Sequence, residues 1–486
     1  MNKQSPLIGL PSTLYKPLSD SAVRTIEQNV FRILEESGVL VYSKTARDAF
    51  RTAGAAVDEE SALVKLPKAL VEDAIDSTPS SVTLYSRDDE YNCVLEDSKV
   101  HYGTGGTAIY VLDPDTGLRV PSTIKDVVLN ARMVGELENI HLFTINVFPN
   151  EIKQKDSIDV NRFFHALDNT RKHVMGGIYS LEGCKKVVRL GELIAGSMDA
   201  LRAKPFISFI TLIISPYKID DIYGEMTCYL ASNELPVVVP TEPVCGTTSP
   251  VTLAGNVLSH ITETIAGIAL VQCVKKGAPA ICGSVGSITN LRTMDHVGGA
   301  VERGMINAAV SQMAQHFAVP FYGTGGTSDA QEVGIQSSFE SAMSSLLVAM
   351  SGANYIHDIA GLMETDLTVS YEKLVIDNEI LGMCQRVLKG IEVNEDTLGV
   401  EMVLEKGPGK DFLAEAHTIA YIRDEFFEPS IANRKLRDTS TPADKAETKA
   451  AEVVRNMREK PAESVLPAET RARALEMFPD IIGDGS

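Results

Sequence analysis

The sequence predicts an α/β protein whose body is a (β/α)8 barrel of the TIM type, with an N-terminal helical and β extension and C-terminal helices. Eight short apolar runs alternate with long amphipathic segments, and the pairs recur at intervals of roughly 30 to 40 residues. Most runs end in Gly, Ser, Thr or Asn, which are typical of loops after buried strands. Eight strand–helix units close a parallel barrel, although an open doubly wound sheet shows the same alternation.

The eight apolar runs are the expected strands. In chain order they read KVHYG, HLFTINVF, KHVMGGI, PFISFIT, LPVVVP, APAICGS, VPFYGTGG and ANYIHDIAG. Helical patterns follow them at residues 123–138, 157–169, 181–194, 218–234, 250–276, 297–317, 330–350 and 371–390. A proline opens several of the runs, where a missing backbone N–H costs little.

Other segments lie outside this repeat. Residues 20–36 and 67–77 carry apolar positions at helical spacing, and residues 81–112 alternate in short runs typical of hairpins. The last segment is a polar turn followed by charged helices, which we interpret as an oligomer contact or a solvated tail. The expected organisation is an extension over 1–97 that packs on the barrel, the barrel over 98–435 and a helical tail over 436–486.

Composition limits the possible partners. Forty-five basic and 65 acidic side chains among 486 residues leave a formal charge of -20, which repels nucleic acid. We find no apolar, uncharged run of the ~18 residues that a membrane span needs, so we expect a cytoplasmic protein without a membrane partner. The seven cysteines are scattered and form no C-x-x-C pair, and we expect neither disulfides nor a bound metal.

Two copies of YGTGGT, at residues 102–107 and 322–327, each end an expected strand. Glycines let a backbone turn sharply and approach a ligand closely, so both loops could line one pocket, or both could share a turn chemistry without a ligand. The second copy is the stronger candidate because Asp329 and Gln331 follow it. It lacks the lysine of a phosphate-binding loop.

Further polar side chains follow other strands, where barrel enzymes keep functional groups. Asn354 and His357 come from the eighth run, and a histidine beside an aspartate can act as a base, orient a substrate or satisfy a backbone carbonyl. Glu242 after the fifth run could face a cation or cap the next helix. Asn146 could anchor a ligand, and Arg292 could form a fork onto a carboxylate. The rings of Tyr102, Phe148 and Tyr322 could face a quaternary ammonium.

Taken together, several segments resemble the trimethylamine methyltransferase family, especially its members that lack pyrrolysine and demethylate betaines. They are LPSTLYKPLSD, EESGVLVYS, LRTMD, GGTSDAQ, NYIHDIAG and DNEI, spread from about residue 10 to 430. The family's trimethylamine enzymes carry pyrrolysine in the loop that corresponds to residues 323–332 here. This chain has only standard residues there, which argues against trimethylamine and is shared by relatives that act on betaines or carnitine-like compounds.

The resemblance implies a quaternary amine (glycine betaine-type):corrinoid methyltransferase that moves an N-methyl group to Co(I) of a cobalamin carried by a small partner corrinoid protein. It also suggests a homo-oligomer. Under this reading Glu242 and Asp329 face the ammonium, His357 orients the substrate, and Arg292 or Arg303 holds a substrate carboxylate. The expected catalytic residues are therefore His357, Asp329 and Glu242. The expected substrate-binding residues are Tyr102, Asn146, Phe148, Arg292, Arg303, Tyr322, Gly325, Gly326, Gln331 and Asn354.

Two alternatives belong to other functional classes. The first is another barrel enzyme, such as a lyase or aldolase with a Schiff-base lysine, although no lysine stands at the end of an expected strand. The second is a non-catalytic betaine-binding protein. We find no G-x-S-x-G, H-E-x-x-H or dinucleotide-binding pattern, so the sequence shows no protein nucleophile.

Overall fold

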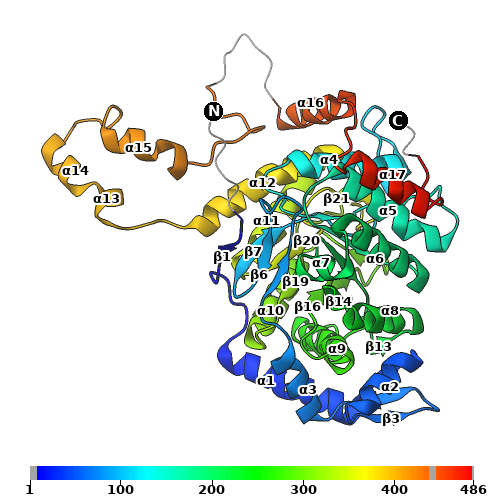
Figure 1. Cartoon of the computed structure of the whole chain (residues 1–486). Helices are drawn as coiled ribbons and strands as arrows, with labels where there is room; N and C mark the ends of the chain where they lie inside the picture. The colour runs from blue at the N-terminus through cyan, green and yellow to red at the C-terminus, as the bar shows by residue number, and fades with distance from the viewer. Residues whose placement is uncertain (1–7, 437–444, 484–486) are drawn as a thin grey trace.

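The computed structural model describes residues 8–436 and 445–483, and its centre is a closed barrel of eight parallel strands (Figure 1). The strands are β7 (Lys99–Tyr102), β10 (Phe143–Thr144), β11 (Val174–Gly177), β12 (Ile207–Ile210), β14 (Val237–Thr241), β16 (Ala280–Ser284), β19 (Phe321–Thr324) and β20 (Tyr355–His357). Each expected strand is confirmed. A parallel bridge between Gly103 and Leu142 joins the ends of the row, which excludes the open sheet.

A helix returns from each strand and forms the outer layer, as expected from the 3.6-residue apolar period. The helices are α4 (Ile124–Glu136), α5 (Lys155–Asn169), α6 (Leu181–Ala195), α8 (Asp221–Ser232), α9 (Leu253–Val274), α10 (Val301–His316), α11 (Ile335–Met350) and α12 (Tyr371–Lys389). Side-chain caps begin several of them, as where Ser370 accepts from the backbone N–H of Lys373. An additional short helix, α7 (Met198–Ala203), follows α6.

Helix α9 is long and apolar enough to cross a membrane by length and composition alone. Within the structure, however, 83% of its most apolar 18-residue window is buried against the rest of the chain. It also carries the buried polar residues His260 and Glu263. The helix is therefore explained as a core helix between the barrel and the N-terminal extension.

The N-terminal extension covers α9 from outside (Figure 1). Its elements are β1 (Leu10–Pro11), α1 (Asp20–Arg32), a π-helical turn η1 (Ile33–Ser37), β2 (Val39–Val41), α2 (Lys44–Thr52), β3 (Ala56–Asp58), β4 (Leu63–Lys65) and α3 (Lys68–Ser77). Strand β1 adds antiparallel to β7, and β2 pairs with β13 (Lys218–Ile219) before α8. These pairings tie the extension to the barrel by main-chain hydrogen bonds.

A hairpin closes the N-terminal end of the barrel. Strands β5 (Val82–Leu84) and β6 (Cys93–Leu95) pair antiparallel. Leu84 and Leu95 are fully buried and belong to one apolar cluster with barrel-interior residues such as Met175. The open end is therefore the C-terminal end of the strands, where loops carry the active sites of barrel enzymes.

Short strands that the sequence did not reveal border this open end. One sheet combines β8 (Tyr110–Leu112), β9 (Arg119–Pro121), β21 (Leu362–Met363) and β22 (Thr368–Val369), and another combines β15 (Val244–Cys245), β17 (Ser287–Thr289) and β18 (His296–Val297). Because their hydrogen bonds join loops that follow different strands, they hold those loops in fixed relative positions.

The C-terminal helices form two groups. Helices α13 (Glu395–Leu398), α14 (Val400–Lys406) and α15 (Ala416–Glu425) make an arm that projects from the end of α12 (Figure 1). Helices α16 (Ala446–Glu459) and α17 (Ala468–Met477) return to the body, where α16 packs on α12 and α17 on α6.

Candidate active site

The histidine of the eighth strand is fixed on three sides. His357 ends β20 and is buried, and its ring stacks on Tyr322 with centroids 3.8 Å apart. The Thr324 hydroxyl donates to the Ser284 carbonyl, so it accepts from His357 Nε2, 2.7 Å away. Asp358 Oδ1 lies 2.8 Å from the other ring nitrogen. The imidazole is therefore held in one orientation at the base of the mouth.

A buried guanidinium stands beside this pair. Arg303 on α10 pairs with Asp366 at 2.7 Å and lies 3.9 Å from Asp358. It also donates to Thr327 at 2.9 Å, which fixes the loop after β19. Burial alone would lower the pKa of Arg303, but the neighbouring carboxylates raise it, so it stays a cation.

His296 lies between Glu242 and Asp366. It begins β18, and its ring nitrogens lie 3.6 Å from Glu242 Oε1 and 3.5 Å from Asp366 Oδ2. Burial would raise the pKa of Asp366, but Arg303 and His296 hold it well below the usual range. Asp366 is therefore a permanent anion near neutral pH.

Glu242 lies just after β14, and its side chain is 43% exposed. Its pKa is nevertheless raised, mainly because surrounding protein disfavours the charge, and His296 and Arg303 oppose this only in part. Glu242 is thus the acidic group of the site best placed to meet a ligand.

The site contains more anions than fixed cations. Asp358 and Asp366 flank the single guanidinium of Arg303, and Glu242 supplies a third carboxylate beside His296. Among the described residues, Asp366 Oδ1 and two nitrogens of Arg303 are buried without a hydrogen-bond partner. Because such groups are costly to leave unpaired, they indicate that water or a polar ligand completes the cluster.

Backbone strain is concentrated at the same place. Asp358 and Asp366 have φ of 60° and 66°, and Glu364 and Thr365 before Asp366 also lie in the left-handed region. Non-glycine residues persist there only when surrounding contacts hold them, and such positions gather at functional sites. The turn after β21 is therefore built to aim Asp366 at Arg303.

His296 and Asp366 were not predicted as site residues from the sequence, and Asp358 was predicted only as the neighbour of His357. Both missed residues follow regions that were noticed, the LRTMD loop and the NYIHDIAG strand. Neither stands at the end of an expected barrel strand. They reach the site through β18 and β21, short strands without a clear apolar pattern.

The loop after β19 supports the site differently from what was expected. Both carboxylate oxygens of Asp329 accept backbone N–H groups, from Gly298 at 2.8 Å and Gly299 at 3.0 Å. Burial raises the pKa of Asp329, and these two bonds lower it in part. Asp329 thus fixes the segment between His296 and Arg303, while Gln331 is exposed to solvent. Their expected contacts with the substrate stay predictions.

Four other expected residues lie in different surroundings. Tyr102 is buried and stacks on His141, which contacts Gln385 of α12, so its ring faces the helix layer. Asn354 precedes β20 and binds backbone carbonyls at the closed end. Phe148 packs edge-on against another ring, and Arg292 is exposed on the rim.

Asn146 is fully buried after β10. Its amide nitrogen donates to Asn130 of α4 at 3.2 Å, and its side-chain oxygen has no hydrogen-bond partner among the described residues. Of the residues predicted from sequence, the structure brings together His357, Tyr322, Glu242 and Arg303, with Gly325, Gly326 and Asp329 in the loop beside them.

The glycines of the second YGTGGT copy serve close packing within the protein. A Cβ on Gly326, whose φ is 72°, would lie 2.5 Å from the Ile359 carbonyl oxygen, and one on Gly325 would lie 3.0 Å from Ile356. These glycines let the loop lie against the segment that carries His357 and Asp358. We expected these glycines to let a ligand approach closely, but in the structure their close neighbours are Ile356 and Ile359 of the same chain.

Gly326→Ala is expected to lower the free energy of unfolding by several kcal/mol, because it combines a left-handed φ with a backbone collision. Gly117→Ala is the matched control, since Gly117 has φ of 68° and open space around it, and it should cost only about 1 kcal/mol. Urea unfolding measures both. Equal losses would contradict the packing role of Gly326.

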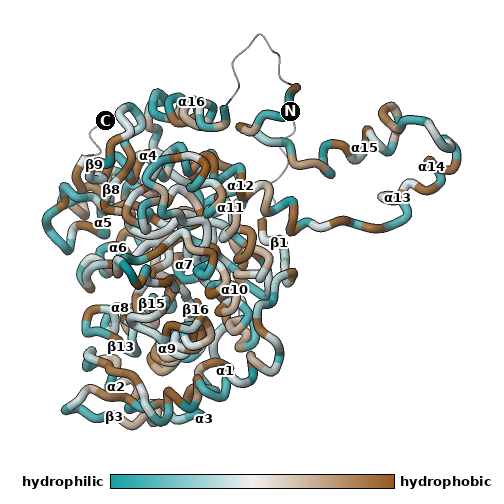
Figure 2. Tube along the Cα trace, turned by 180° about the vertical axis from the view of Figure 1, so that it is seen from behind, coloured by the Kyte–Doolittle hydropathy of each residue, from teal (hydrophilic) through white to brown (hydrophobic). Residues whose placement is uncertain are grey.

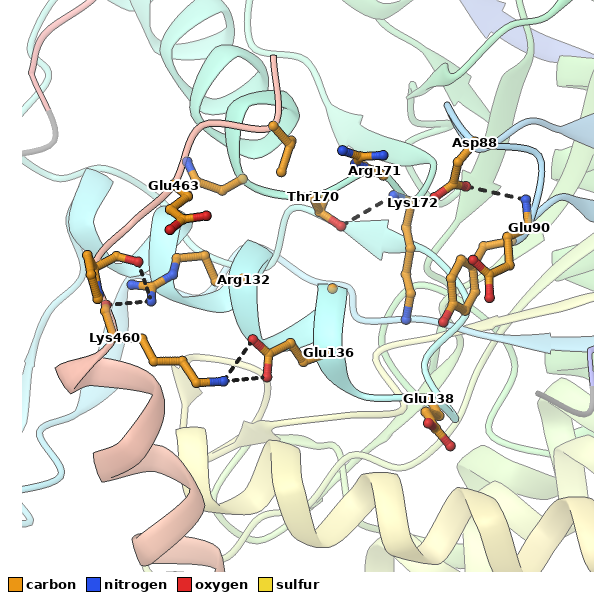
Figure 3. A pocket seen from close by; sticks show the side chains of 15 residues that line it. Asp88, Glu90, Arg132, Glu136, Glu138, Thr170, Arg171, Lys172, Lys460 and Glu463 are labelled. Atoms are coloured by element: carbon orange, nitrogen blue, oxygen red, sulfur yellow. Dashed lines mark hydrogen bonds and ion pairs between the residues drawn. The ribbon is translucent and has the colours of Figure 1, made fainter. Parts of the chain in front are cut away.

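A pocket of about 660 Å³ lies at the opposite end of the barrel (Figure 3). Its wall includes Lys172, whose pKa burial lowers to about 7. Lys172 precedes β11, and its Nζ donates to the carbonyls of Val134, Leu137 and Ile140. This lysine therefore ties α4 to the barrel, and its position and bonds do not favour a Schiff-base enzyme.

Comparison with known proteins gives a consistent picture. A family model described as trimethylamine methyltransferase (MTTB) matches residues 1–480. A trimethylamine methyltransferase MttB of Desulfitobacterium hafniense (strain DSM 10664 / DCB-2) is 31% identical over 420 residues, 86% of this chain and 84% of the relative. A glycine betaine methyltransferase of D. hafniense (strain Y51) is 29% identical over 438 residues, 90% of each chain.

The MttB of Methanosarcina barkeri (strain Fusaro / DSM 804) is 33% identical over 404 residues, 82% of this chain and 81% of the relative. A crystal structure of the M. barkeri monomethylamine methyltransferase covers 99% of this chain and 98% of its own, at 11% identity and a TM-score of 0.46, which adds nothing to the fold described above. Because the family model spans residues 1–480 and relatives exceed 30% identity, the chain belongs to the trimethylamine methyltransferase (MTTB) family.

Proposed function

We propose that this chain is a quaternary amine:corrinoid protein methyltransferase that acts on a betaine. The observation that carries the proposal is the excess of carboxylates at the barrel mouth, where Asp358 and Asp366 flank one guanidinium and Glu242 lies beside His296. A relative of 29% identity that bears the name glycine betaine methyltransferase supports the substrate class. The loop of residues 323–332 contains only standard residues, which also supports a betaine rather than trimethylamine as the substrate.

The two ends of a betaine suit different groups of the site. Its ammonium would lie near Glu242, whose side chain is accessible to solvent. Its carboxylate would approach Arg303, which has two nitrogens without a hydrogen-bond partner among the described residues. His357 would orient the substrate from below, since its ring is fixed by Thr324 and Tyr322. The chain's contribution is positioning and exclusion of water.

The mouth also suits a partner that brings a corrinoid. The rim carries exposed apolar side chains on loops after different strands, namely Val251, Leu291, Met294 and Leu367. Exposed apolar side chains of this kind are typical of a protein-docking surface, and the partner would sit over the mouth for its corrinoid to reach the substrate. The corrinoid, when bound, supplies a nucleophilic Co(I), and a quaternary nitrogen leaves as a tertiary amine without protonation.

No acid or base is therefore required of the chain for the transfer itself. Among the described residues no cluster of His, Cys, Asp and Glu side chains is arranged to hold a metal ion. A cofactor used as Co(I) needs a reducing compartment, which agrees with the cytoplasmic location expected from the sequence.

Mixing the full chain with reduced cobalamin and a panel of amines tests the proposal. A betaine should consume Co(I), followed as a change in the corrinoid absorption spectrum, and trimethylamine should not. Omission of the chain is the control for spontaneous methylation. Rapid reaction of trimethylamine without betaine activity would overturn the substrate assignment, and tight betaine binding without any transfer, even with a corrinoid protein supplied, would favour the binding-protein alternative.

A further inference from the structure

The arm of residues 391–429 has no apolar core of its own. It contains no buried residue, and its helices α13, α14 and α15 have 4, 7 and 10 residues. Isolated helices of such lengths are marginal in water and depend on packing against another surface. The arm projects from the body in both views, and the chain's own α12 meets it at its end, where Arg386 bonds to Glu425 and Lys389 to Asp424, so most of its length lacks that surface (Figures 1 and 2).

Large apolar side chains are nevertheless frequent along the arm, as the brown segments of α14 and α15 show (Figure 2). Those that are exposed are Ile391, Val393, Leu398, Val400, Val403, Leu404, Leu413, Ile419, Ile422 and Phe426. At roughly 100 Å² each they present about 1,000 Å² of apolar surface, more than the ~800 Å² that one partner contributes to a standard interface. This is enough for a stable complex.

A second exposed apolar surface lies on the outside of the barrel. Ile335, Phe339 and Met343 occur at intervals of four on α11, so they form one stripe, and each is at least 54% exposed. The adjacent helix α12 adds exposed Met383 and Val387. Among the described helices that follow barrel strands, no other one exposes three large apolar side chains.

The position of the arm argues against the corrinoid protein as its occupant. Helix α12 begins beside the mouth at Tyr371 and ends at Lys389, so its 19 residues carry the chain roughly 28 Å toward the closed end. The arm starts there. A partner that delivers a corrinoid must cover the mouth, whereas a partner that stabilises the arm must be present whenever the chain is folded. A second copy of the chain satisfies this condition.

We propose that the arm of each copy packs across the α11–α12 stripe of a second copy, so that two arms and two stripes form a reciprocal twofold interface. Both surfaces then occur in every subunit, as a twofold interface requires. The interface lies outside the barrel and leaves the mouth open. The inference is independent of which amine is methylated.

Light scattering of the intact chain after size-exclusion chromatography gives the first test. The particle mass should be at least twice the 52.6 kDa of the chain at micromolar concentration. Leu404→Glu with Ile419→Glu on the arm, and separately Phe339→Glu with Met343→Glu on the stripe, should each raise the dissociation constant roughly 30-fold or more. Ile222→Glu on α8, where Ile222 is 40% exposed, is the matched control and should leave the mass unchanged.

Cross-linking keeps the proposal testable if a charged variant does not fold. Mixed isotope-labelled and unlabelled wild-type chains should yield cross-links from Lys406 or Lys410 of the arm to the body of the other copy. A wild-type mass of one chain, an unchanged mass in both folded variants, or cross-links confined to one copy would overturn the interface. Protection of the arm by a corrinoid protein alone would assign it to that partner instead.

Discussion

Glu242→Gln is expected to raise the KM for a quaternary amine roughly ten- to a hundredfold, while kcat changes less. The variant removes the negative charge of an accessible side chain and keeps the size of that side chain. Stability should change little, because the side chain is 43% exposed and makes only a 3.6 Å contact with His296. Steady-state kinetics of Co(I) consumption against amine concentration measures the effect.

The pH dependence sharpens this prediction. The pKa of Glu242 is raised, so its binding charge is present above that raised pKa and is lost as the pH falls through it. KM should therefore increase on acidification in the wild type and stay flat in the Gln variant over the same range. Glu302→Gln, in the first turn of α10, is the control. An unchanged KM in Glu242→Gln would remove this residue from the ammonium site.

Acidification from pH 6.5 to 4.5 is expected to destabilise the fold through three buried histidines by roughly 6 kcal/mol, comparable to the whole stability of a typical domain. Burial lowers the pKa of His101 and His173 to about 4 and that of His260 to about 3. Because the folded-state pKa values lie below the unfolded value near 6.5, the unfolded chain takes up protons first. Stability is full above pH 6.5 and is lost as the pH falls toward these values.

Urea unfolding followed by circular dichroism at several pH values measures this loss. His260→Gln should reduce the slope of the free energy of unfolding against pH by the equivalent of about one proton, because the buried ring stays neutral in the fold. The Nδ1 atom of this ring lies 3.2 Å from the Asn256 carbonyl oxygen. His417→Gln on the arm is the control, since that ring is partly exposed. A free energy of unfolding that stays constant between pH 6.5 and 4.5 would contradict the neutral, buried state of these histidines.

The barrel itself was readable from the sequence because its elements are local patterns. Each buried parallel strand is a continuous apolar run, as in LPVVVP and APAICGS, and each covering helix repeats every 3.6 residues. Residues at the ends of those strands were therefore also predictable: His357 ends β20 and Glu242 follows β14. Only the tertiary structure distinguished the closed barrel from an open sheet, through the Gly103–Leu142 bridge.

Identical hexapeptides turned out to have different surroundings. Tyr102 faces the helix layer and Tyr322 the barrel interior, although both begin YGTGGT. Residue type and spacing do not specify the side of a strand on which a ring lies, because a register difference of one residue reverses it. Asn354 is close in sequence to His357 but precedes β20, whereas His357 ends it, so Asn354 binds backbone at the closed end of the barrel.

The sequence by itself determined the eight strand–helix units, the family and the strand ends from which site residues come. The tertiary structure decided which distant loops meet, and it added His296 and Asp366 beside Arg303 and turned Asp329 toward the backbone of Gly298 and Gly299. The physical reason is that strands and helices follow from local apolar periodicity, whereas an ion-pair cluster depends on loops from separate units, whose approach is set by packing over the whole barrel.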